Sequence, residues 1–217
     1  MTKHRLDADA YIFDFDGTVA DSMDMWSHKM LSILDESGVS YPDDIIKTIT
    51  PMGDRGTAKY FVEKLGVNMT VDEIERQMNA TALHAYTYTI QAKDTAAETV
   101  KQLKKEGFPT AILTASPHSM VDVCLKRLGL FEYFDYVWSC DDFKTTKTDP
   151  EIYAKISEIM SAEPSRCVLA DDNINALTTA KAAGWQTIGV FDKSSADDEK
   201  EIQKITDIYV RNLAELL

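Results

Sequence analysis

The sequence has no long hydrophobic run, no basic cluster and no paired cysteines. None of its apolar stretches approaches the ~20 residues that a membrane-spanning helix needs, which excludes such a helix. No basic run is longer than Lys104-Lys105 and the net charge is −13, so the positive surface that nucleic-acid binding requires is missing. The three cysteines are far apart and form no Cys-x-x-Cys pair, which favours free thiols in a reducing compartment.

The remaining composition is typical of a globular protein. Of the 217 residues, 27% are charged and 44% hydrophobic, and this length allows one large domain or a core with a small insert. Residues 1–10 are polar and run directly into the first apolar segment, so we expect no signal peptide. We therefore expect a cytoplasmic protein, a monomer or a weak homodimer, with no membrane or nucleic-acid partner.

A short apolar segment, Tyr11-Ile12-Phe13, runs into Asp14-Phe15-Asp16-Gly17-Thr18. Such a run, closed by Gly, is typical of a buried parallel strand that ends at the carboxyl edge of a sheet, where open α/β sheets bind ligands. Two carboxylates one residue apart repel each other unless one is protonated or a cation holds both ionised. An acidic turn that merely caps a strand is the alternative.

Two patterns divide the chain. Between residues 20 and 90, apolar stripes at helical spacing predict a small helical bundle with no strand. From Asp94 onward, helices and strands alternate, which predicts a doubly wound parallel sheet of the Rossmann-like α/β class. The expected organisation is a core of residues 1–19 and 91–217 and an inserted helical cap domain of residues 20–90. Later strands are expected at 108–113, 134–138, 167–170, 185–190 and 208–210.

Three further strand ends or helix starts carry polar groups. Thr114-Ala115-Ser116-Pro117 places a hydroxyl at a strand end before a helix start, where free amides and the helix dipole favour anions. Lys147 precedes a helix that Asp149-Pro150 opens, and Asp171-Asp172 follows an apolar strand. Each feature alone also fits a helix cap or a solvated loop, but their order along one sheet edge indicates a phosphate-handling site.

These residues resemble the four motifs of the haloacid dehalogenase superfamily. The motifs are Asp14-Phe15-Asp16-Gly17-Thr18, Thr114, Lys147 in Lys-Thr-Asp-Pro-Glu-Ile-Tyr, and Asp171-Asp172-Asn173 followed by Ala-Ala-Gly. The resemblance covers essentially the whole chain. The position of the helical insert is similar to that of the subfamily with a helical cap of C1 type, which includes phosphoglycolate phosphatases and β-phosphoglucomutase.

The resemblance implies a role for each motif. Asp14 would be the nucleophile that forms an aspartyl-phosphate, and Asp16 the general acid and then base. Mg²⁺ would be bound by Asp14, the Asp16 backbone carbonyl and Asp172, with Asp171 as a second ligand if it follows the Glu-Asp variant of the family. The phosphoryl oxygens of a small phosphorylated metabolite would be bound by Thr114, Ala115, Ser116 and Lys147.

Departures from the family pattern narrow the activity. Dehalogenases lack the second acid of the first motif, so Asp16 favours phosphate over halide substrates. The mutase has a cap histidine at the spacing where this sequence has Trp26. Phosphonatases have a lysine in the first cap helix, and the nearest lysine here, Lys29, lies three residues further on. The expected activity is therefore Mg²⁺-dependent hydrolysis of small phosphomonoesters.

Several alternatives remain open. A phosphosugar mutase is the enzymatic alternative, and a non-catalytic binding module with the same fold is the other. A signalling receiver domain also combines acids, Thr and Lys, but in another order and in half this length. In the insert, Arg55 could bind an anionic substrate tail, although a solvated loop arginine is the more common case.

Overall fold

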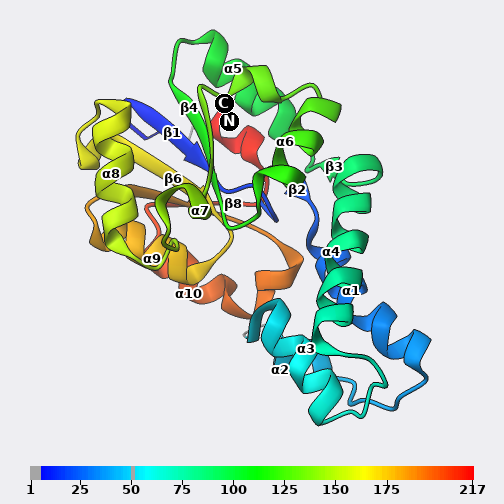
Figure 1. Cartoon of the computed structure of the whole chain (residues 1–217). Helices are drawn as coiled ribbons and strands as arrows, with labels where there is room; N and C mark the ends of the chain where they lie inside the picture. The colour runs from blue at the N-terminus through cyan, green and yellow to red at the C-terminus, as the bar shows by residue number, and fades with distance from the viewer. Residues whose placement is uncertain (1–5, 50–51) are drawn as a thin grey trace. The chain divides into compact units, whose positions relative to one another are not determined.

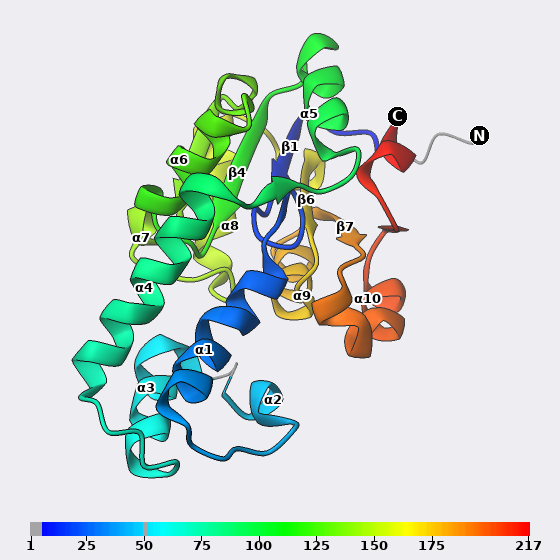
Figure 2. The same cartoon turned by 90° about the vertical axis from the view of Figure 1, so that its right-hand side faces the viewer.

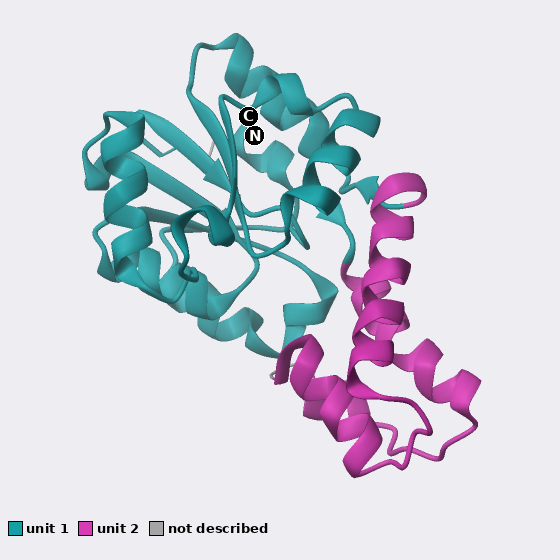
Figure 3. Ribbon diagram, in the orientation of Figure 1, with its two compact units in different colours: residues 1–22, 90–217 teal, residues 23–89 magenta. Residues whose placement is uncertain are grey.

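The computed structural model describes residues 6–49 and 52–217. The chain divides into two compact units (Figure 3): Met1–Ser22 with Ile90–Leu217, here called the sheet unit, and Met23–Thr89, here called the helical unit. Residues 1–5, on which part of the signal-peptide prediction depends, lie outside the described residues. Among the described residues, no helix combines the length and the apolar character needed to cross a membrane.

The sheet unit is built on six parallel strands. Their order across the sheet is β5-β4-β1-β6-β7-β8, so β1 pairs with β4 on one side and with β6 on the other. This order confirms the predicted Rossmann-like α/β fold. The strands are β1 (Ala10–Phe13), β4 (Thr110–Thr114), β5 (Tyr136–Ser139), β6 (Cys167–Asp171), β7 (Gln186–Val190) and β8 (Ile208–Val210).

Helices cover both faces of this sheet (Figures 1 and 2). On one face lie α5 (Ala96–Lys105) and α6 (His118–Arg127), and on the other α8 (Pro150–Met160), α9 (Ile174–Ala182) and α10 (Glu199–Ile205). Because side chains alternate along β1, Ile12 joins the cluster with Leu177 and Ile152, while Tyr11 and Phe13 contact the rings of Phe108 and Phe134. The central strand is therefore buried on both sides.

Three strands, β4, β5 and β7, begin later than predicted. At β4 and β7 the reason is that aromatic residues complete helix ends. Phe108 donates its N–H to the Leu103 carbonyl, and Trp185 does the same to Ala180. In both cases the bond spans a glycine with positive φ, Gly107 or Gly184, as in a Schellman motif with an apolar residue after the helix. Read as a sequence, these aromatic residues look like the first residues of the next strand.

The two segments that connect the units pair with each other. Ala20 and Asp21 form β2 (Ala20–Asp21), which runs antiparallel to β3 (Gln91–Ala92). The prediction that residues 20–90 contain no strand is therefore wrong at its first two residues. Backbone hydrogen bonding between β2 and β3 brings both connections together within the sheet unit.

The helical unit contains α1 (Met23–Ser37), α2 (Ile45–Ile49), α3 (Gly53–Glu63) and α4 (Val71–Tyr88). Its core includes Ile33, Leu34, Phe61, Ile74 and Met78, all with at most 1% of their surface exposed. Helix α4 begins with a capping box: the Thr70 side chain accepts from the Glu73 N–H, and the Glu73 side chain accepts from the Thr70 N–H. Short elements of the sheet unit are α7 (Cys140–Phe143), η2 (Phe131–Tyr133), η3 (Pro164–Arg166), η4 (Lys193–Asp198) and η5 (Leu213–Leu216).

All three cysteines are free and buried. Cys167 starts β6, Cys140 starts α7 and Cys124 lies in α6. Burial raises the pKa of the Cys124 thiol to about 11. The cysteines therefore behave as small core residues rather than as reactive groups.

Candidate active site

Three strand ends meet at the carboxyl edge of the sheet. Asp14 follows β1, and its N–H donates to the Ala170 carbonyl of β6, which places it beside Asp171 and Asp172. Thr114 ends β4 on the other side of β1. The parallel register thus gathers the first, second and fourth motifs at one edge, as their positions after buried strands predict.

Lys147 joins two of the carboxylates. Its Nζ lies 2.7 Å from Asp14 Oδ1 and 2.7 Å from Asp171 Oδ2. The lysine precedes α8, and Tyr153 of that helix donates its hydroxyl proton to the Lys147 carbonyl at 2.7 Å. Only 12% of the Lys147 side chain is exposed, so its charge acts at short range with little screening.

Asp14, Asp171 and Asp172 form a buried cluster in which one oxygen of each lies within 4.8 Å of the others. The pKa of Asp14 is raised to about 7, mainly by burial. The charge of Lys147 opposes this rise, and the charges of Asp171 and Asp16 add to it. Burial, together with Asp171 and Asp14, also raises the pKa of Asp172 well above its usual range. One ammonium does not balance three buried carboxylates, and hard oxygen donors of this kind fit Mg²⁺.

Residues 14–19, here called the acidic loop, connect β1 to β2. Gly17 allows this loop to approach Asp172. Its φ is +78°, and a Cβ at this position would lie 2.8 Å from Asp172 Oδ2. An L side chain would therefore meet both an unfavourable backbone conformation and a carboxylate. The Gly of the first motif is needed for the geometry of the last.

Asp16 makes a different set of contacts. Ser22 Oγ donates to its Oδ1 at 2.6 Å, and Ser116 Oγ donates to its Oδ2 at 2.6 Å. Its carboxylate is not part of the three-aspartate cluster. Two hydroxyls, one close to Asp16 in the sequence and one far from it, therefore fix the orientation of the Asp16 side chain.

Sequence reasoning missed Ser22. This residue lies between β2 and α1, where a serine is most simply interpreted as a helix N-cap, yet its side chain is fully buried and its hydroxyl binds Asp16. Its place directly after the first connecting segment is the only signal in the sequence. The contact spans six residues, so no helical or strand periodicity reveals it.

The second motif is arranged around its own hydroxyl. Thr114 Oγ1 accepts a hydrogen bond from the Ser116 N–H at 3.0 Å, and both residues are buried. Ala115 is exposed between them. Of the predicted phosphate-binding residues, Ser116 is thus held by Thr114 through its backbone and contacts Asp16 through its side chain.

Arg55 belongs to α3 of the helical unit. Its guanidinium forms ion pairs with Asp72, at 3.1 Å, and with Glu75, and 60% of its side chain is exposed. These partners lie on α4 of the same unit. A role for Arg55 in substrate binding stays a prediction, and such a role would have to compete with two carboxylates.

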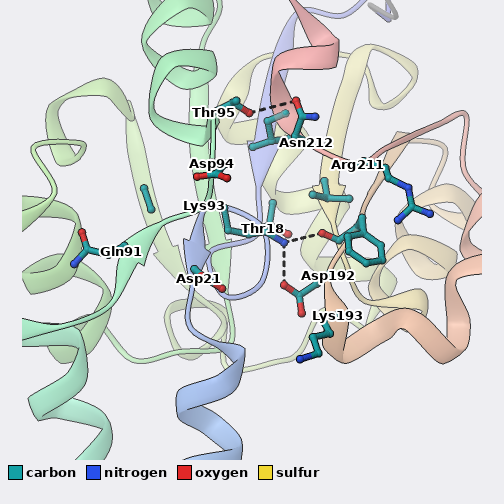
Figure 4. A pocket seen from close by; sticks show the side chains of 14 residues that line it. Thr18, Asp21, Gln91, Lys93, Asp94, Thr95, Asp192, Lys193, Arg211 and Asn212 are labelled. Atoms are coloured by element: carbon teal, nitrogen blue, oxygen red, sulfur yellow. Dashed lines mark hydrogen bonds and ion pairs between the residues drawn. The ribbon is translucent and has the colours of Figure 1, made fainter.

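A cavity of about 660 Å³ lies next to the acidic loop and is lined by residues of the sheet unit (Figure 4). Its lining includes Thr18, Lys93 and Asp192 but none of the three clustered aspartates. Thr18 Oγ1 is buried without a hydrogen-bond partner among the described residues. The cavity therefore borders the loop that carries Asp16 but does not include the candidate metal site.

The fold and the site define an α/β protein with a lysine and a buried aspartate cluster at the carboxyl edge of its sheet. A family model described as haloacid dehalogenase-like hydrolase matches residues 11–190, and the chain belongs to this family. The "Phosphorylated carbohydrates phosphatase" of Thermotoga maritima is 24% identical over 180 residues, covering 83% of each chain. The pyrophosphatase PpaX of Bacillus velezensis is 28% identical over 193 residues, covering 88% of this chain and 85% of the relative.

Solved structures agree on the fold. A candidate β-phosphoglucomutase from Thermotoga maritima superposes with a TM-score of 0.83 at 23% identity, covering 96% of both chains. The matched relatives are named as phosphatases, which confirms the predicted family and the prediction of a phosphatase-type enzyme.

Proposed function

We propose that the protein is a Mg²⁺-dependent phosphatase that hydrolyses small phosphomonoesters through an aspartyl-phosphate at Asp14. The observation that carries this proposal is the contact of Lys147 with Asp14 and Asp171 at 2.7 Å each, beside Asp172. A lysine placed there offsets the charge of a carboxylate nucleophile and is within reach of an incoming phosphoryl group. Phosphoryl transfer depends mainly on positioning and charge neutralisation, and this set of residues provides both.

The chain's own residues account for the proton and bond changes. Asp14 attacks phosphorus while the bond to the ester oxygen breaks, and Asp16 gives its proton to the departing oxygen. Water then attacks phosphorus, Asp16 takes a proton from it, and the bond between phosphorus and Asp14 breaks. Asp14 is then again a carboxylate, and Asp16 again a protonated carboxylic acid. Ser22 and Ser116 hold Asp16 apart from the cluster, as its separate role requires.

The donor set fits a magnesium ion. Asp14, Asp171, Asp172 and the Asp16 backbone carbonyl would hold Mg²⁺, which when bound neutralises charge on the phosphoryl oxygens. The raised pKa values of Asp14 and Asp172 support this assignment, because they reflect buried like charges that a divalent cation would relieve.

The helical unit is proposed to act as a cap, residues 20–90, on a core of residues 1–19 and 91–217. The pairing of β2 with β3 supports this, because it gathers both connections where a hinge could act. Closure over the site would exclude water and limit substrates to small molecules. The relative that acts on phosphorylated carbohydrates favours a sugar phosphate as the substrate class.

A phosphosugar mutase is the second candidate, because a candidate β-phosphoglucomutase shares the fold. At the position of the mutase's cap histidine, Trp26 contacts the ring of Tyr86 edge-on and lies under Lys29 Nζ at 3.7 Å. This side chain offers no proton-transfer group for a sugar hydroxyl. Water is therefore the proposed acceptor.

A panel of small phosphomonoesters, assayed for phosphate release with and without Mg²⁺, tests the proposal. We expect Mg²⁺-dependent release from wild type and none above background from Asp14→Asn, with unchanged circular dichroism. Turnover by Asp14→Asn at the wild-type rate would refute the nucleophile assignment. Interconversion of sugar phosphates faster than phosphate release would favour the mutase, and absence of turnover on the whole panel would favour a binding module.

A further inference from the structure

Lys93 makes an unusual set of contacts directly after β3. Its Nζ donates to the Gly17 carbonyl at 2.7 Å, to the Phe191 carbonyl at 2.7 Å and to Asp192 Oδ2 at 2.9 Å. Figure 4 shows its side chain reaching toward Asp192, with the dashed contacts converging on the ammonium. The three N–H groups of one ammonium are thus matched by three acceptors from two distant loops.

The backbone of Lys93 binds the same acidic loop. Its N–H donates to the Val19 carbonyl at 2.8 Å, while Nζ holds the carbonyl of Gly17 two residues earlier. The loop also closes on itself, because Gly17 donates to Ala20 and Val19 to Phe15. Lys93 therefore hydrogen-bonds to two carbonyls, those of Gly17 and Val19, in the segment that immediately follows Asp16.

The far end of the contact is rigid as well. Only 18% of the Lys93 side chain and 8% of the Asp192 side chain are exposed. Asp192 also accepts hydrogen bonds from the N–H and the hydroxyl of Ser194. A buried pair with all its acceptors satisfied holds its geometry better than a surface ion pair, whose side chains exchange with water. The loop after β7 is therefore a fixed support for Lys93.

We propose that Lys93 is a positioning residue for Asp16: it ties the backbone of the acidic loop to the second connecting segment and to the loop after β7. This proposal rests on the proposed function, in which Asp16 is the general acid. Ser22 and Ser116 orient the carboxylate, whereas Lys93 fixes the backbone from which that carboxylate projects. A loop displaced by about 1 Å would misplace the proton donor, and such displacements lower rates about a hundredfold.

Two substrates with different leaving groups distinguish a misplaced general acid from a general loss of structure in a Lys93 variant. An alkyl phosphate needs a proton on its leaving oxygen, whereas 4-nitrophenyl phosphate releases a stable anion and needs little help. The ratio kcat/KM reports the first transfer, to Asp14, because that step is the first irreversible one. We expect Lys93→Met to lower kcat/KM at least about tenfold for an alkyl phosphate and less than about threefold for 4-nitrophenyl phosphate, with KM little changed.

Lys181→Met is the matched control. Lys181 pairs with Asp207 at 2.9 Å in the same unit without touching the acidic loop. We expect this control to leave the ratio between the two substrates unchanged. Equal losses on both substrates in Lys93→Met, or no loss on either, would overturn the positioning role.

Amide hydrogen exchange at Gly17 and Val19 provides a readout that does not depend on turnover. Lys93→Met should accelerate exchange at these two amides, which bond within the loop, while Lys181→Met should not. If wild type shows no phosphatase activity, the proposed function fails. The exchange result still decides whether Lys93 fixes the loop, and unchanged exchange would contradict that role.

Discussion

Ser22 donates a hydrogen bond to Asp16 Oδ1 at 2.6 Å, and the hydroxyl that does so lies at the junction of β2 and α1. The second oxygen of Asp16 is bound by Ser116, from the loop after β4. The proposed general acid is therefore bound by two hydroxyls of the sheet unit, one from Ser22, the last residue before the helical unit, and one from Ser116. Its orientation depends on both.

Replacement of Ser22 should impair the acid more than the nucleophile. The hydrogen bond that Ser22→Ala removes strengthens as Asp16 gives up its proton and becomes charged. A hydrogen bond to a charged group is worth about 1.5–3 kcal/mol, which corresponds to at least about a tenfold loss in kcat/KM for an alkyl phosphate. The loss on 4-nitrophenyl phosphate should be smaller. Ser32→Ala, which removes a hydroxyl bonded to the Lys29 carbonyl within α1, serves as the control. Equal kinetics of Ser22→Ala and Ser32→Ala would contradict the role of Ser22.

Magnesium should stabilise the folded protein. A cation that binds the aspartate cluster only in the folded state adds about 2.7 kcal/mol at a hundred times its Kd, so Tm should rise with free Mg²⁺. Asp172→Ala should remove most of this rise, and Asp171→Ala should reduce it less. The exposed Asp94 provides the control Asp94→Ala, which should respond like wild type. A Tm that stays constant across millimolar Mg²⁺ would count against the metal site.

Three of the four motifs could be predicted from the sequence because each follows a regular pattern. An apolar strand followed by polar residues places Asp14, Thr114 and Asp171 at the same sheet edge whatever the detailed packing. Lys147 could be placed only through the family resemblance, because a loop lysine alone is usually solvated. The structure adds its two carboxylate partners.

The contacts of Ser22 and Lys93 could not be predicted in the same way. Lys93 binds Gly17 and Asp192, which lie 76 and 99 residues away along the chain, and no local periodicity encodes such pairs. The starts of β4 and β7 were missed for a local reason. Phe108 and Trp185 have high β-propensity, but their N–H groups are used to close the preceding helices.

The stability of the sheet unit should depend on the protonation of His118. Both ring nitrogens meet carboxylates, Nδ1 that of Asp122 at 3.0 Å and Nε2 that of Asp142 at 2.9 Å. Hydrogen bonds to Asp122 and Asp142 raise the pKa of His118 above its usual value, although partial burial opposes them. A raised pKa in the folded state means that the stabilisation is complete below about pH 6.5 and is lost as the pH rises through the folded-state pKa.

His118→Gln should therefore lower Tm at pH 5.5 and leave it unchanged at pH 9. Because 43% of the His118 side chain is exposed, the loss in free energy of unfolding should stay below about 1 kcal/mol. His84, which is exposed and contacts the ring of Tyr88 at a tilt in the helical unit, provides the control His84→Gln. A Tm difference for His118→Gln that persists at pH 9 would show that its carboxylate contacts are not the cause.

Comparing substitutions at two glycines with positive φ distinguishes the cost of backbone strain from the effect of crowding the aspartate cluster. Gly17 and Gly107 have φ of +78° and +87°, but a Cβ at Gly107 meets no atom within 4 Å, whereas at Gly17 it would lie 2.8 Å from Asp172 Oδ2. Both Gly→Ala substitutions should cost about 1–2 kcal/mol for the left-handed backbone. Gly17→Ala must in addition displace Asp172 from the aspartate cluster.

The Mg²⁺-dependent rise in Tm is the measurement that distinguishes the two substitutions. In Gly107→Ala, Tm should fall in the absence of metal but rise with Mg²⁺ as far as in wild type. In Gly17→Ala, Tm should fall at least as much, and the response to Mg²⁺ should be largely lost because Asp172 no longer reaches its place beside Asp14 and Asp171. A full Mg²⁺ response in Gly17→Ala would mean that Asp172 can move aside without loss of binding, and Asp172 would then not be a ligand.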